Sequence, residues 1–217
     1  MLTPKEQPYL EGLNSYYLNL EKLTEHLQGE IGSGCIYGKA VSHEFLIFFD
    51  ENEIIQSVIQ EKDKKAVHSD NLSVVEQPFK QYSFVLKIFD LSPHAVFFWG
   101  QMPTYQRAKP SLLSADIPLP DLIFRLRQKH FSGFIDVDIL NKQEGGLLFF
   151  QKGHRVGGSY SWGGSGLSKS DEDYILLLGK VQVDGGVFRF GSYVKEIIDR
   201  EARERIEVHA FPHGQSK

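Results

Sequence analysis

The same order of hydrophobic and polar patterns occurs twice along the chain. Near its start, Leu20, Leu23 and Leu27 are spaced i, i+3 and i+7, which places them on one face of a helix. Residues 117–137 begin with the same spacing of leucines, so a second short amphipathic helix is predicted there. A Ser-Gly pair follows each helix. In the second copy the next residues alternate, which predicts a strand with Asp136 and Asp138 on one solvated face.

Three blocks of sequence match in the same order, at a separation of about 100 residues. Residues 18–38 match residues 117–137, residues 45–57 match residues 146–158, and residues 94–100 match residues 185–191. Chance matches would not keep this order along the chain. We therefore infer a tandem duplication.

Each copy predicts the order helix, strand, hairpin, helix and strand. Gly153 lies in the hairpin turn of the second copy, where the backbone needs a positive φ, and Asn52 takes its place in the first. The second helix is expected near residues 80–89 and 171–180, and the final strand at residues 94–100 and 185–191. The predicted fold class is α+β: two tandem repeats, each a small antiparallel sheet with two helices on one face, plus a C-terminal helix.

The boundary between the copies is marked by two prolines and by polar residues without a clear period. We expect the first repeat at residues 1–102, a linker at residues 103–116 and the second repeat at residues 117–192. Residues 193–217 are predicted to form a charged helix followed by a frayed tail.

Composition narrows the classes of function. The 217 residues carry a net charge of -4, which argues against a general nucleic-acid binder. The single cysteine, Cys35, allows no internal disulfide and fits a reducing compartment. The apolar runs are far shorter than the roughly 20 residues that cross a bilayer, and the N-terminus does not resemble a signal peptide. We expect a cytoplasmic protein without membrane insertion.

A glycine-rich stretch, GGSGLSKS at residues 163–170, comes within one residue of a phosphate-binding loop. The preceding segment is predicted to be a hairpin arm rather than a buried parallel strand, and three carboxylates follow at residues 171–173. We favour a helix start in which Ser168 or Ser170 caps the helix. The alternative is a phosphate site that uses Lys169 and Ser170.

The other groups of reactive side chains give little indication of a metal site or a catalytic site. His209 and His213 have metal-ligand spacing, but Pro212 between them argues against a helix and no third ligand is evident. Cys35 is interpreted as a small core residue, and Asp136 and Asp138 as solvated rather than catalytic. We therefore predict no metal, no cofactor and no catalytic residue.

Three residues beside the glycine-rich stretch are candidates for binding a protein partner. Arg155, Tyr160 and Trp162 belong to the residue types that most often anchor protein interfaces. The structural alternative is that Trp162 packs on its own sheet.

The second repeat resembles the PATAN (PatA N-terminal-like) domain family. The resemblance rests on residues 115–191: a leucine-rich helix, a Ser-Gly turn before a strand, the hairpin GGLLFFQKGHRVGGSY and the final strand GGVFRFG. The first repeat resembles the family more faintly. The resemblance implies an interaction module of bacterial signalling, tied to motility or cell-pattern control, and it implies no catalytic residues.

We therefore expect a non-catalytic adaptor that binds a protein partner and can form a homodimer. The alternative hypothesis is a small-molecule sensor for a nucleotide or cyclic dinucleotide, using Arg155, Lys169 and stacking on Tyr160 or Trp162.

Overall fold

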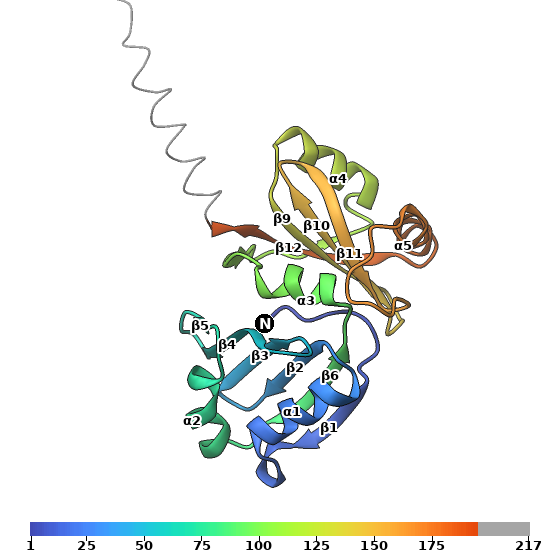
Figure 1. Cartoon of the computed structure of the whole chain (residues 1–217). Coiled ribbons are helices and arrows are strands. Elements are labelled where there is room, and N and C mark those ends of the chain that lie inside the picture. The colour runs from blue at the N-terminus through green and yellow to red at the C-terminus, as the bar shows by residue number, and fades with distance from the viewer. Residues whose placement is uncertain (195–217) are drawn as a thin grey trace, which may run out of the picture. The chain divides into compact units, whose positions relative to one another are not determined.

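The structure is a computed structural model that describes residues 1–194 (Figure 1). The chain divides into two compact units that do not follow the repeats of the sequence. Unit 1 contains Met1–Met102, Glu144–Leu147 and Gly157–Tyr174. Unit 2 contains Pro103–Gln143, Leu148–Val156 and the chain from Ile175 onward. A segment late in the sequence is therefore part of the first unit.

Unit 1 is built on a six-stranded sheet with the order β1-β6-β2-β3-β4-β5. All of its paired strands run antiparallel. The strands are β1 (Leu10–Asn14), β2 (Gly34–Lys39), β3 (His43–Phe49), β4 (Ile54–Glu61), β5 (Val67–Ser69) and β6 (Val85–Asp90). The helices are α1 (Leu20–Glu30), α2 (Ser73–Gln81) and α3 (Pro93–Gly100), with a 3-10 turn η1 (Ser15–Tyr17).

Helices cover both faces of this sheet. On one face, Leu27 of α1 and Phe79 of α2 pack with Phe45, Ile47 and other alternate residues of the strands into one apolar core. The opposite face carries Phe48, whose ring stacks on Trp99 of α3 with centroids 6.5 Å apart. The alternation along β3 thus supplies two separate packing layers, because successive side chains of a strand point to opposite faces.

Unit 2 contains most of a second six-stranded sheet, with the order β11-β10-β9-β12-β7 and with β8 also paired to β12. Its strands are β7 (Tyr105–Arg107), β8 (Leu112–Leu113), β9 (Gly133–Ile139), β10 (Gly145–Gln151), β11 (His154–Tyr160) and β12 (Gly186–Tyr193). The helices are α4 (Leu119–Gln128) and α5 (Asp171–Asp184). One end of the β10–β11 hairpin is grouped with unit 1, so the boundary between the units crosses this sheet.

The two sheets share a common core of four strands. The order β6-β2-β3-β4 in the first sheet corresponds to β12-β9-β10-β11 in the second, which fits a tandem repeat loosely. Gly34 and Gly133 begin the equivalent strands β2 and β9. A Cβ atom at Gly34 would lie 2.4 Å from the Phe89 carbonyl oxygen, and one at Gly133 would lie 2.0 Å from the Gly191 carbonyl oxygen. Both positions need glycine because the neighbouring strand, β6 or β12, passes so closely.

The predicted fold class is wrong in its inventory of elements. Within residues 1–194 there are twelve strands and five helices, in two six-stranded sheets, rather than two small sheets with two helices each. Residues 105–107 and 112–113, in the segment expected to be a linker, form strands that pair with β12. The predicted C-terminal helix lies outside the described residues, apart from Tyr193, which ends β12, and Val194.

Residues 94–100 were expected to form the final strand of the first copy and instead form α3. The aromatic residues of this run favour a strand locally. However, the Ser92 side chain accepts a hydrogen bond from Ala95 N, and Pro93 occupies the first helical turn. The strand that corresponds to β12 is β6, and the preceding helix α2 ends at Gln81 rather than near residue 89.

The two hairpin turns also differ. Gly153 adopts the expected positive φ of 84°, and Lys152 before it has a φ of 49°. Asn52 was expected to play the same part but is not among the positive-φ residues. In that turn the Asp50 carboxylate accepts hydrogen bonds from the backbone N–H groups of Asn52 and Glu53, so a side chain rather than a left-handed residue closes the turn.

Candidate interaction surfaces

The glycine-rich segment is a packed part of unit 1. Trp99 of α3 donates a hydrogen bond from Nε1 to the Gly166 carbonyl at 2.9 Å, and Ser92 N donates to the Ser165 carbonyl at 3.2 Å. Gly166 has a φ of 78°, and a Cβ atom there would lie 2.4 Å from Cδ2 of Leu91. The glycine at this position therefore allows close packing of the loop on the segment around α3.

The end of this segment starts α5. The Ser170 hydroxyl accepts a hydrogen bond from Glu172 N at 3.0 Å, the contact expected of a capping residue. Ser168 Oγ donates to Asp173 Oδ2 at 2.5 Å, and Lys169 is exposed. These contacts use a backbone donor that a phosphate would need, and they place a carboxylate beside it. They support the helix-start interpretation, while the phosphate site at Lys169 and Ser170 stays a prediction.

The aromatic candidates beside the segment pack on each other. Tyr160 is completely buried. Its ring stacks on Trp162 with centroids 5.4 Å apart, and Trp162 Nε1 donates to Asp173 Oδ1 at 3.1 Å. Tyr160 lies at the end of β11 where four successive residues are buried, and this run of burial could not be derived from the local sequence.

Arg155 does not join these two aromatic residues in one unit. Arg155 is half-buried and is grouped with unit 2, whereas Tyr160 and Trp162 are grouped with unit 1. The predicted partner-binding set of Arg155, Tyr160 and Trp162 therefore contains one buried ring, one half-buried ring and one half-buried cation. Its role in binding stays a prediction.

A buried carboxyl group lies under the same segment. Glu6 is 6% exposed, and Ser159 Oγ donates to its Oε2 at 2.6 Å. Lys5 N donates to Ser159 Oγ at 2.7 Å, which ties the N-terminal segment to β11 within unit 1. Burial raises the pKa of the Glu6 carboxyl. Sequence reasoning missed this residue, because nothing in a polar N-terminal stretch marks one glutamate as buried.

Glu6 makes the stability of unit 1 depend on pH. The pKa of the Glu6 carboxyl is raised in the folded chain, so its protonated form contributes fully to the free energy of unfolding below the ordinary carboxyl pKa. This contribution is lost as the pH rises through the pKa of the folded state. Glu6→Gln keeps a neutral side chain at every pH. We expect Glu6→Gln to gain stability relative to the wild type as the pH rises from about 4.5 to 7.5, measured by urea unfolding. A difference that stays constant across this range would contradict the prediction.

The surroundings of Cys35 and of Asp136 fit a structural role for both residues. Cys35 is completely buried, and burial raises the pKa of its thiol, which disfavours the reactive thiolate. Asp136 is 7% exposed rather than solvated, so that interpretation is wrong for this residue. Arg189, directly opposite on β12, lies 3.8 Å from Asp136 Oδ2 and donates to Asp138 Oδ2 at 2.6 Å. Asp138 and Arg189 are 51 residues apart in the chain, so the partner of these carboxylates was not evident locally.

Within residues 1–194, no group of three or more histidine, cysteine, aspartate or glutamate side chains could hold a metal ion. His209 and His213 lie outside the described residues. Over the same range, none of the helices has the length and apolar character needed to cross a bilayer.

The outer face of α5 is apolar and exposed. Leu177 and Val181 are buried, whereas Ile175 is 63% exposed, Leu176 is 45% exposed and Val183 is 82% exposed. Gly179 lies between the exposed residues, and a Cβ atom there would meet nothing within 4 Å. The sequence predicted this helix but not its exposed side, because apolar residues occur all round it and no single face stands out.

Two further exposed leucines lie at the C-terminal end of α5. Leu140 N donates to the Gly185 carbonyl at 3.2 Å, and Leu113 pairs with Val187 at the start of β12. Leu140 and Leu113 are 39% and 43% exposed. We call the five residues Leu113, Leu140, Ile175, Leu176 and Val183 the α5 patch, and all of them belong to unit 2.

The chain was compared with models of protein families, with curated proteins and with solved structures, and nothing matches in any of the three comparisons. The resemblance to the PATAN family therefore stays a prediction from the residues quoted above.

Proposed function

We propose that the chain is a non-catalytic protein-interaction module that binds a partner through the α5 patch. The observation that carries the proposal is the exposure of Ile175, Leu176 and Val183 on one helix of unit 2. Contiguous exposed apolar surface is typical of interaction sites in folded proteins. The setting that we propose, bacterial signal transduction linked to motility or cell pattern, comes from the resemblance to PATAN domains.

The partner element that best fits this face is an amphipathic helix. Exposed apolar residues at positions 175, 176 and 183 of one helix present a stripe against which the apolar face of a second helix can pack. Gly179 in the middle of the stripe has open space above it, so the backbone of the partner can approach closely. Glu172 is exposed in the first turn of α5, so a basic residue at the facing end of the partner helix would complement it.

The side chains that were candidates for catalysis or phosphate binding have surroundings that favour a binding module over an enzyme. Ser170 caps α5, Cys35 is buried, and Asp136 pairs with Arg189. The alternative, a nucleotide sensor, is not favoured by any of these contacts, because Tyr160 is buried and the Ser170 hydroxyl is engaged.

Site-specific photo-crosslinking tests the proposal. A crosslinking amino acid at position 176, in the cells that make the protein, should give a discrete adduct whose partner can be identified and purified. The double variant Leu176→Glu/Val183→Glu should weaken binding of that purified partner at least roughly a hundredfold, since charges would be placed in an apolar interface. Isothermal titration calorimetry measures this change.

Two controls make the test specific. Gln128→Glu adds one charge to the exposed side of a different helix of unit 2, α4, and should change the affinity by less than about fivefold. A crosslinker at Lys65, which is exposed in unit 1, should give no comparable adduct. The proposal fails if position 176 yields no more adduct than position 65, or if the purified partner binds the double variant as tightly as the wild type.

A further inference from the structure

Equivalent ends of the two sheets are built in the same way. In unit 1, the β3–β4 turn lies against the C-terminal end of α1: Gln28 Nε2 donates to the Asp50 carbonyl at 2.8 Å. In unit 2, the β10–β11 turn lies against the C-terminal end of α4: Gly153 N donates to the Phe131 carbonyl at 2.7 Å, and Lys152 N donates to Ser132 Oγ at 2.7 Å. Each end therefore combines one helix terminus and one hairpin turn, and corresponding positions can be compared directly.

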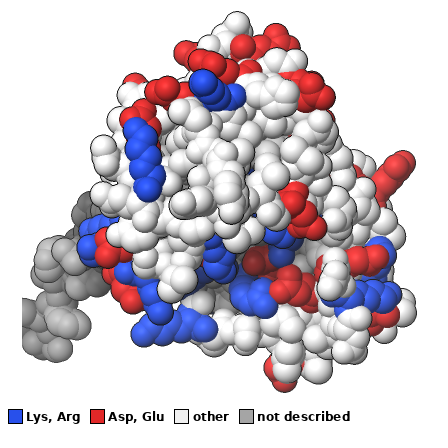
Figure 2. Space-filling view, turned by 90° about the horizontal axis from the view of Figure 1, so that it is seen from below, with Lys and Arg blue, Asp and Glu red and all other residues white. Residues whose placement is uncertain are grey.

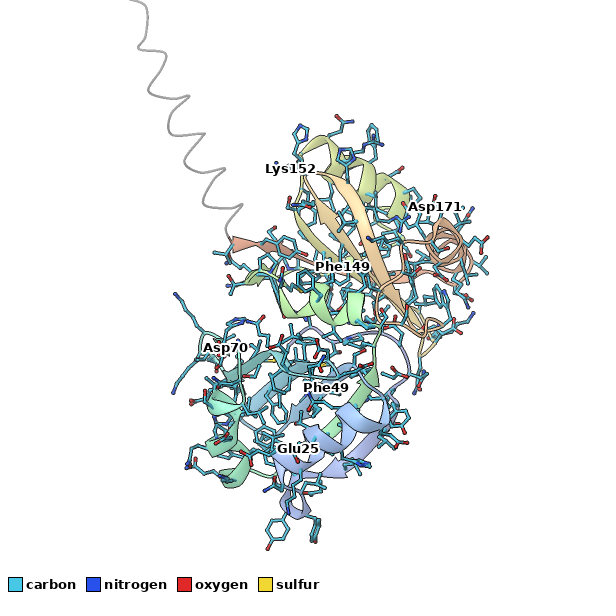
Figure 3. All side chains as sticks on the ribbon, in the orientation of Figure 1. Glu25, Phe49, Asp70, Phe149, Lys152 and Asp171 are labelled. Carbon is cyan, nitrogen blue, oxygen red and sulfur yellow. The ribbon has the colours of Figure 1, made fainter. Side chains whose placement is uncertain are left out.

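The end of unit 1 is acidic. Its carboxylates come from both segments and are Glu25, Glu30, Asp50, Glu51 and Glu53, all exposed except the half-buried Asp50. In the sequence, no lysine or arginine lies between Lys22 and Lys39 or between Lys39 and Lys62. Figure 2 shows a face of the molecule on which acidic and basic side chains both occur, and Figure 3 shows Glu25 of the acidic surface on α1. We call this surface the acidic end.

The end of unit 2 carries the opposite charge. Its exposed side chains are Arg125, Arg127, Lys129, His130, Lys152 and His154, and Lys152 is labelled at the hairpin turn in Figure 3. No acidic residue lies between Asp121 and Asp136 or between Glu144 and Asp171. Among residues 1–194, none of these six side chains forms an ion pair with a carboxylate. We call this surface the basic end.

Helix stability alone does not account for the basic end. Arg125 and Arg127 lie in the last turn of α4, where a cation is favourable to the helix dipole. Lys152 and His154 come from the hairpin turn, so the dipole of α4 does not explain why they are there. In addition, Phe124, which precedes Arg125 on α4, is 62% exposed and offers an aromatic surface. The combination is typical of a surface that meets an anionic partner.

We propose that the basic end of one molecule docks on the acidic end of a second copy of the chain. The chain itself carries both halves of the contact. One surface has cations from a helix end and a turn, and the other has carboxylates at the equivalent places. Because the two surfaces differ, each contact joins the basic end of one molecule to the acidic end of another. This inference is independent of the α5 patch and of the function proposed for it.

Analytical ultracentrifugation of the purified full chain tests the proposal. At about 50 mM NaCl the average mass should rise with protein concentration, and raising NaCl to about 500 mM should weaken the association at least tenfold, because exposed charges are screened. Arg127→Glu/Lys152→Glu reverses the basic end, and Glu51→Lys/Glu53→Lys reverses the acidic end. Each double variant alone should associate at least roughly tenfold more weakly than the wild type.

Mixing the two reversed variants is the decisive step. In the mixture, unaltered acidic ends can meet unaltered basic ends, and the reversed ends are complementary to each other, so association should return. Lys62→Glu/Lys65→Glu changes the net charge by the same amount as the reversal of the basic end, but at the opposite end of β4. This control should associate as the wild type does. If circular dichroism shows that a reversed variant does not fold, the neutral pair Arg127→Gln/Lys152→Gln or Glu51→Gln/Glu53→Gln replaces it. The neutral variant should associate more weakly than the wild type.

Three results would overturn the proposal. The wild type could stay monomeric at low salt up to millimolar concentration, its association could be insensitive to salt and to both reversals, or the mixture of reversed variants could stay dissociated. Association that depends on Leu176 and Val183 but not on the charged ends would instead place the contact between copies at the α5 patch.

Discussion

Replacing Trp99 with alanine should lower the free energy of unfolding by about 3–5 kcal/mol, the range for large aromatic residues in cores. Trp99 is 3% exposed and packs between two parts of unit 1 that are far apart in the sequence. Its ring stacks on Phe48 of β3, and its Nε1 donates to the Gly166 carbonyl. The substitution removes both contacts and leaves a cavity under the glycine-rich loop. Urea unfolding followed by circular dichroism measures the loss.

A conservative variant separates the ring from its hydrogen bond. Trp99→Phe keeps an aromatic ring over Phe48 but leaves the buried Gly166 carbonyl without this donor. We expect it to cost about 1–3 kcal/mol, the range for an unsatisfied buried polar group. Equal losses for alanine and phenylalanine would mean that the packing of α3 on the sheet contributes little, contrary to the structure.

Gly133→Ala should destabilise the chain by about 2–3 kcal/mol, as expected when a buried site is overpacked. Gly133 starts β9 with a φ of 155°, and a new Cβ atom would lie 2.0 Å from the Gly191 carbonyl oxygen of β12. Backbone atoms cannot move aside as a flexible side chain can, so the pairing of β9 with β12 must shift. Urea unfolding of the purified variant measures the change.

Gly179→Ala is the matched control for this substitution. Gly179 lies in α5, and a Cβ atom there meets nothing within 4 Å. Alanine has a higher helix propensity than glycine, so this variant should gain about 0.5–1 kcal/mol. A similar effect of both substitutions would show that close approach of β12 does not govern the requirement for glycine at position 133.

Local periodicity located the elements whose neighbours are close in the sequence. The leucine spacing at positions 20, 23 and 27 predicted a helix that the structure places at Leu20–Glu30. Gly153 was correctly predicted to take a positive φ, because a tight turn restricts the backbone whatever surrounds it. By contrast, residues 94–100 form a helix because Ser92 and Pro93 start one, and aromatic composition alone pointed the other way.

The candidate surfaces were harder to predict, because burial is decided by distant segments. Tyr160 and Trp162 are residue types that often anchor interfaces. Yet the burial of Tyr160 and the contact of Trp162 with Asp173 follow from the packing of residues 157–174 in unit 1. Conversely, the outward face of α5 could not be separated from its buried face by sequence period. The acidic and basic ends involve charges on hairpin turns and helix ends that become neighbours only through the fold.

Because unit 1 combines early and late segments of the chain, its packing is completed only late in translation. Residues 1–102 emerge first and contain the first sheet with its three helices, but the segment that contacts Leu91 and Trp99 comes at residues 157–174. At a synthesis rate of roughly 5–20 residues per second, these apolar side chains stay without their cover for several seconds. During translation, therefore, the nascent first half presents α3 to chaperones before its own chain can close over it.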